Sequence, residues 1–137
     1  MREILFRGKD IADNWHYGDL EYITDDFVKI VNHRMNEYGK KVEIDTVGQF
    51  TGLLDKNRKK IFEGDIGRYQ QTDGARQNNK PIICIGKVIY NAKTASFAVE
   101  SKDEKEVKYF DYFPVKDFEI IGNIHDNPEL LESGGEG

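Results

Sequence analysis

Residues 43–66 constrain the fold of this chain more than any other stretch. Two short apolar runs, 50–54 and 61–62, flank a turn that carries Asp55, Asn57 and four basic side chains. Aspartate and asparagine tolerate the left-handed backbone of tight turns, so the segment predicts a β-hairpin with a charged tip. Glycine and two acids follow at 63–65. They indicate a second tight turn that leads into another strand.

Short β-favouring runs ended by turn residues recur along the whole chain. Nine or ten such runs at this spacing predict an all-β, mainly antiparallel domain. We expect a small, partly open β-barrel with SH3-like character. The longest stretch without strand character, residues 70–81, is rich in Gln, Asn and Asp. It predicts a polar loop that is either mobile or bound by a partner.

A helix start is visible near the end of the chain. Asn127 stands where an N-cap side chain would accept an amide hydrogen bond, and Pro128 takes the first helical position. Glu129 places an acid at the positive end of the helix dipole. The pattern predicts a short C-terminal helix whose Leu130 and Leu131 pack on the barrel.

Length and composition predict the number of domains and the compartment. A length of 137 residues predicts one domain, which we assign to residues 1–132, with a disordered glycine-rich tail at 133–137. No apolar run approaches the roughly 18 residues of a membrane span, and no signal-peptide segment is visible. The single cysteine, Cys84, fits a reducing compartment and predicts a buried thiol. These features predict a cytoplasmic protein.

Three motifs follow one another along the chain. Residues 6–9 with 15–18 come first, the hairpin stretch 46–66 second, and residues 120–131 last. Together they resemble the YopX family of phage and prophage proteins. The resemblance implies a β-rich fold and a bacterial host cell, and no reaction. One position departs from it, because Arg58 stands where the family usually has glycine. If its φ is positive, the side chain adds strain of about 1 kcal/mol.

No recognisable catalytic pattern accompanies these motifs. The chain has no paired metal-binding histidines, phosphate-binding loop or nucleophile elbow. His16, His33 and His125 stand on separate predicted elements, so a site would need carboxylates that converge on them in space. We therefore predict a protein that is not an enzyme, with no catalytic residue, cofactor or metal.

Positive charge is concentrated at the tip of the predicted hairpin, in Lys56, Arg58, Lys59 and Lys60. The net charge of −5 argues against broad attraction to nucleic acid, but it does not exclude such a local patch. The neighbouring acids Asp55 and Glu63 dilute the patch. A solvated turn is therefore favoured over a nucleic-acid contact.

Two functional hypotheses follow. The first is a non-enzymatic interaction module that forms a homo-oligomer and acts on a host or phage protein. It rests on the missing catalytic motifs, on strand edges that could pair between subunits and on the polar loop. The alternative is a nucleic-acid-binding small β-barrel that uses the basic hairpin 55–60.

Overall fold

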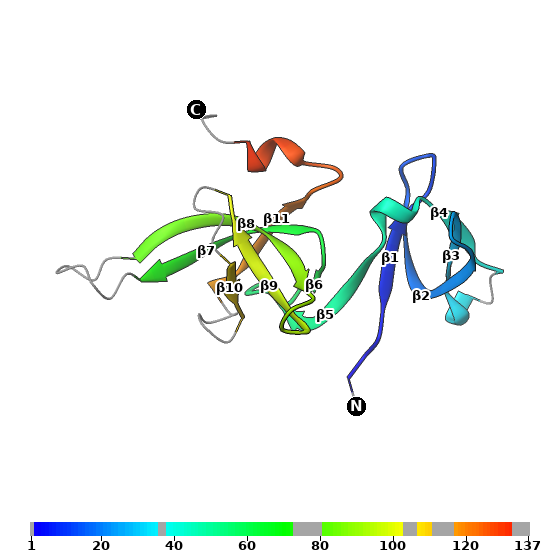
Figure 1. Cartoon of the computed structure of the whole chain (residues 1–137), viewed down its shortest axis with the longest axis horizontal. Helices are drawn as coiled ribbons and strands as arrows, with labels where there is room; N and C mark the ends of the chain where they lie inside the picture. Colours follow the sequence, from blue (N-terminus) through cyan, green and yellow to red (C-terminus); the bar gives the residue numbers. More distant parts are fainter. Residues whose placement is uncertain (1, 36–37, 73–80, 103–106, 111–116, 133–137) are drawn as a thin grey trace. The chain divides into compact units, whose positions relative to one another are not determined.

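Antiparallel strands make up the fold (Figure 1). The computed structural model describes residues 2–35, 38–72, 81–102, 107–110 and 117–132. Within these residues the chain forms strands and 3-10 turns and no α-helix, which confirms the all-β, mainly antiparallel prediction. By its contacts the chain divides into two compact units, Met1–Gly52 and Leu53–Gly137. Assignment of residues 1–132 to one domain stays a prediction, and residues 133–137 lie outside the described part.

The first unit is an antiparallel sheet in the order β4-β3-β2-β1-β5. Its last strand, β5, crosses the boundary between the units at Gly52 and Leu53. Two 3-10 turns, η1 and η2, stand on either side of β4. The elements are β1 (Phe6–Lys9), β2 (Trp15–Thr24), β3 (Phe27–Val31), η1 (His33–Met35), β4 (Lys40–Val42), η2 (Ile44–Thr46) and β5 (Gly48–Leu54).

Strand register places the core of the first unit on one face of its sheet. Leu20 pairs with Ile30 on the neighbouring strand, and Val28 pairs with Val42. Cross-strand partners share a face, so these apolar side chains pack together, and the three residues of β3 and β4 among them are at most 2% exposed. Each such burial contributes about 1.5–3 kcal/mol.

The second unit contains a five-stranded antiparallel sheet in the order β10-β9-β8-β7-β11. Strand β6 precedes it and pairs with the end of β5 in the β5–β6 hairpin. A 3-10 turn, η4, follows the last strand. The elements are β6 (Lys60–Phe62), β7 (Asp65–Thr72), β8 (Pro81–Asn91), β9 (Ser96–Ser101), β10 (Val107–Tyr109), β11 (Glu119–Asn123) and η4 (Pro128–Leu131).

Aromatic rings dominate the core of the second unit. Phe118 is fully buried, and its ring stacks with Tyr69 at a centroid distance of 6.2 Å. Phe110 meets the same ring edge-on at 5.6 Å. Aliphatic side chains complete this cluster: Ile61, Val88 and Val99. The half-buried Cys84 packs against the cluster, so its thiol is less enclosed than predicted.

The predicted C-terminal helix is wrong. Pro128–Leu131 is a single 3-10 turn, and the backbone of Glu132 is already extended. Asn127 makes no capping bond there; instead its Oδ1 accepts a hydrogen bond from the amide of Asn123 at 3.2 Å. The side chain therefore bonds back to the last strand, and a turn of four residues cannot gain the cooperativity of an α-helix.

Two further predictions are refined by the structure. The strand order of each sheet is open, so neither sheet closes into a barrel within the described ranges. The expected polar loop 70–81 is shorter, because β7 continues to Thr72 and β8 begins at Pro81; residues 73–80 lie outside the described part.

Candidate functional site

Lys56, Arg58 and Lys59 of the predicted contact site lie on the turn of the β5–β6 hairpin, and Lys60 begins β6; all four are exposed. The turn closes through two backbone hydrogen bonds. The amide of Asp55 donates to the carbonyl of Lys59 at 2.8 Å, and the amide of Arg58 donates to the carbonyl of Asp55 at 2.9 Å. The structure thus confirms a hairpin with a charged tip.

The carboxylate of Asp55 is the central group of this turn. Its Oδ1 accepts hydrogen bonds from the amides of Asn57 and Lys59 at 2.8 and 2.9 Å. Its Oδ2 accepts a hydrogen bond from the backbone amide of Ile120, on β11, at 3.0 Å. Asp55 is only 4% exposed. The sequence suggested an acid that dilutes the basic patch, whereas the structure shows a buried carboxylate that attaches the turn to β11.

The basic side chains at the tip do not act as one cluster. The Nζ of Lys56 lies 3.6 Å from Oε1 of Glu119, which also accepts a hydrogen bond from Nη2 of Arg68 at 2.6 Å. The hydrogen bond from Arg68 lowers the pKa of Glu119 below its ordinary value, with Lys56 as a second cause. Arg58 and Lys59 make no ion pair with any residue that the structure describes. Within the described part of the chain, no carboxylate compensates these two charges.

Arg58 has a φ of 66°, which lies in the left-handed region. An L side chain there costs about 1 kcal/mol, and glycine avoids most of that cost. We therefore expect Arg58→Gly to raise the free energy of unfolding by up to about 1 kcal/mol, measured by urea denaturation.

Gly52 provides the reverse control for this prediction. Its φ is 91°, and a Cβ built there would meet no atom within 4 Å. Gly52→Ala should therefore lower the free energy of unfolding by about 1 kcal/mol through backbone strain alone. An Arg58→Gly variant that is less stable than the wild type would show that the side chain makes a favourable contact.

Histidines meet carboxylates at two places in the first unit. The Nε2 of His16 lies 2.7 Å from Oδ2 of Asp10, and both side chains are largely buried. The Nε2 of His33 lies 3.0 Å from Oδ2 of Asp19 on the exposed surface. No group of three or more His, Cys, Asp or Glu residues that could hold a metal occurs among the described residues. Each pair therefore lacks the third ligand that a metal site requires.

Asp10 also organises the β1–β2 turn. Its Oδ1 accepts hydrogen bonds from the backbone amides of Ala12 and Asn14 at 2.9 and 3.0 Å. The hydrogen bond from His16, followed by the one from the Asn14 amide, lowers the pKa of Asp10 to about 2. The ionised carboxylate is thus favoured by the folded chain.

The lowered pKa predicts a pH dependence of stability. Because the folded-state pKa of Asp10 is below its ordinary value, the ionised carboxylate stabilises the fold above about pH 4, and this contribution is lost as the pH falls through about 2. Asp10→Asn keeps an oxygen for the two turn amides but loses the charge. We expect the wild type to be more stable than this variant at neutral pH and equally stable near pH 2. A carboxyl NMR titration of Asp10 with an ordinary midpoint would contradict the prediction.

A cavity of about 400 Å³ opens in the second unit and was not anticipated from the sequence. Its walls come from β8, from the end of β9 and from η4. No local motif joins residues of three separate elements, so the sequence carries no signal for it. The residues that line it are Lys87, Glu100, Ser101, Lys102 and Leu131.

These features define an antiparallel all-β protein. The chain belongs to the YopX family, because the family model described as YopX protein matches residues 6–132. This match covers nearly the whole chain and confirms the resemblance seen in the three motifs. No helix in the described ranges is long and apolar enough to cross a membrane.

The fold also occurs among solved structures. The crystal structure of protein EF1440 from Enterococcus faecalis matches with a TM-score of 0.56 and 22% sequence identity. The match covers 96% of this chain and 100% of the other. At this identity the likeness shows the fold alone. A search of the curated proteins found no match.

Proposed function

We propose that this chain is a non-enzymatic interaction module of a phage or prophage, which associates with itself and acts on a host or phage protein in the bacterial cytoplasm. The observation that carries the proposal is the apolar end of the β2–β3 hairpin. Tyr22 and Ile23 are 66% and 51% exposed there, next to the turn into β3. Large apolar side chains left in water at the end of a hairpin are typical of a surface that a partner covers.

The geometry of this hairpin end supports the proposal. The register of β2 against β3 shifts between Tyr22 and Thr24, so Ile23 has no direct partner on β3 at this irregular end of the hairpin. Tyr22 and Ile23 both present apolar surface to water there. A partner that covers both would remove them from water. Burial of a large apolar side chain contributes about 1.5–3 kcal/mol. Two such anchors form the centre of a small interface.

Strand edges support a side-chain interface over edge pairing. At the outer edge of β11, two backbone groups already have hydrogen-bond partners. The carbonyl of Phe118 accepts a hydrogen bond from the amide of Lys56 at 2.9 Å, and the amide of Ile120 donates one to the carboxylate of Asp55. At the other sheet, β4 has three residues and carries two exposed lysines, Lys40 and Lys41. Short, lysine-bearing edges disfavour strand addition. We therefore assign self-association to the hairpin side chains.

Light scattering after size-exclusion chromatography tests the proposal. We expect the wild-type chain to form an oligomer and the double variant Tyr22→Ser with Ile23→Ser to be monomeric at the same concentration. Ile11→Ser is the matched control, because Ile11 is 90% exposed on a different turn and its loss should leave the oligomer intact. A monomeric wild type, or an oligomer unchanged in the double variant, would exclude this interface.

A second candidate is nucleic-acid binding by the basic hairpin, in the manner of a small β-barrel. It is favoured by the uncompensated Arg58 and Lys59 on a turn that Asp55 holds in place. Two phosphate contacts with single-stranded DNA predict that replacing both residues with alanine reduces the slope of log affinity against log salt by about 1.4. Fluorescence anisotropy with single-stranded DNA measures this slope. Lys93→Ala is the control, and an equal slope in the double variant would exclude the hairpin.

A further inference from the structure

The cavity of the second unit has an unbalanced set of charges. The Nζ of Lys87 lies 3.6 Å from Oε1 of Glu100, its direct cross-strand neighbour, so these two charges compensate one another. The Nζ of Lys102 has only a neutral partner, the carbonyl of Leu130 at 3.5 Å. One positive charge therefore faces the cavity without a carboxylate from the described residues. An ammonium in this position attracts an anion.

A serine lines the same cavity as this ammonium. Ser101 is 4% exposed and lines the same cavity. Its side chain makes no hydrogen bond to any residue within the described ranges. A serine hydroxyl both donates and accepts hydrogen bonds, so one that lines a cavity can bond a ligand oxygen. Ser101 and Lys102 are consecutive residues, and both line the one cavity.

The remaining wall is apolar and is fixed in place. Leu131, from η4, contributes it. The turn that carries this residue is tied to the strands, because the amide of Asn127 donates to the carbonyl of Asn123 at 2.8 Å and the amide of Ile124 donates to Gly64 at 2.9 Å. A ligand that fits all three walls has an anionic head and a short aliphatic body.

We propose that this cavity binds a small organic carboxylate. The carboxylate accepts hydrogen bonds from Nζ of Lys102 and Oγ of Ser101, and its aliphatic part contacts Leu131. A volume of about 400 Å³ suits a small molecule. Phosphate fits less well, because its second negative charge would lie close to the carboxylate of Glu100. This site is separate from the hairpin ends that carry the proposed function.

Amide NMR spectra of the full chain test the proposal with isovalerate as the probe. We expect saturable shifts at Ser101, Lys102 and Leu131. Isoamyl alcohol has the same aliphatic body without the charge, and inorganic phosphate has charge without the body; both should bind at least about tenfold more weakly, a difference of 1.4 kcal/mol. Shifts confined to other residues would overturn the site. Equal binding of the alcohol or of phosphate would overturn the assignment to a carboxylate.

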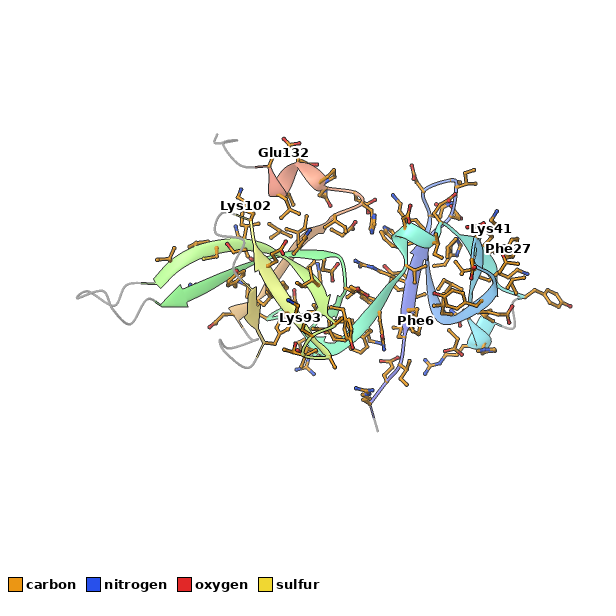
Figure 2. All side chains as sticks on the ribbon, viewed as in Figure 1. Phe6, Phe27, Lys41, Lys93, Lys102 and Glu132 are labelled. Carbon is orange, nitrogen blue, oxygen red and sulfur yellow. The ribbon has the colours of Figure 1, made fainter. Side chains whose placement is uncertain are left out.

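Two variants and a control refine the test. Lys102→Met should weaken isovalerate binding at least about tenfold, because it removes the charged donor. Ser101→Ala should weaken it about fivefold through loss of one hydrogen bond. Figure 2 shows Lys102 beside η4 and Lys93 at the opposite end of the β8–β9 pair, so Lys93→Met is the matched control and should bind as the wild type does. Wild-type affinity in a folded Lys102→Met protein would overturn the proposal.

Discussion

Replacing Asp55 with alanine is expected to lower the free energy of unfolding by about 3 kcal/mol. The carboxylate accepts three hydrogen bonds from backbone amides, those of Asn57, Lys59 and Ile120, and the residue is 4% exposed. The two turn amides can bond water in the variant. The amide of Ile120 is partly buried, so it is left with poor hydration. Urea denaturation with an unchanged slope would measure the loss.

A graded pair of substitutions separates the turn from its attachment to β11. Asp55→Asn keeps an oxygen for the amides of Asn57 and Lys59, but its NH₂ group faces the amide of Ile120, so we expect about half the loss of the alanine variant. Asn57→Ala is the control, because Asn57 is exposed and contributes only its backbone amide; its effect should stay within about 0.5 kcal/mol.

Hydrogen exchange gives a second measurement on the same variants. In Asp55→Ala, the amides of Asn57, Lys59 and Ile120 should exchange faster, together with the Lys56 amide that donates to Phe118. Unchanged protection at Ile120 would show that this amide has another partner and that the attachment to β11 is not made by Asp55.

The sequence predicted the parts of the fold that local chemistry determines. The β5–β6 hairpin was predicted because aspartate and asparagine suit its turn, and the structure confirms it. The left-handed position of Arg58 was identified through a resemblance to a family that usually has glycine there, and its φ of 66° agrees. Both features lie within a few residues, where turn geometry depends little on the rest of the chain.

The remaining features depend on residues that are distant in the sequence. The second oxygen of Asp55 bonds an amide 65 positions away, and no local pattern indicates that contact. The same holds for the cavity, whose walls come from three elements. Asn127 shows how local sequence can mislead. Its context suits a helix cap, but its side-chain oxygen accepts a hydrogen bond from the amide of Asn123 instead of capping a helix. Asx side chains serve either role, so the tertiary context decides.

Gly67→Ala is expected to destabilise the second unit by about 3 kcal/mol, because it overpacks the aromatic core. A Cβ at this position would lie 2.0 Å from Cζ of Phe118 and 2.4 Å from two further ring carbons. The ring cannot move aside freely, since Phe118 is fully buried between Tyr69 and Phe110. Thermal or urea unfolding would measure the loss of stability.

A double-mutant cycle identifies the cause of that loss. Phe118→Ala alone should cost about 4 kcal/mol, since it removes a buried ring and leaves a cavity. In the Phe118→Ala background the added methyl group of Gly67→Ala no longer meets a ring, so its further cost should fall below about 1 kcal/mol. The coupling of about 2 kcal/mol or more between the two sites is then steric. If Gly67→Ala costs the same in both backgrounds, its effect comes from the β7 backbone, and the close contact with the ring does not determine the stability of this core.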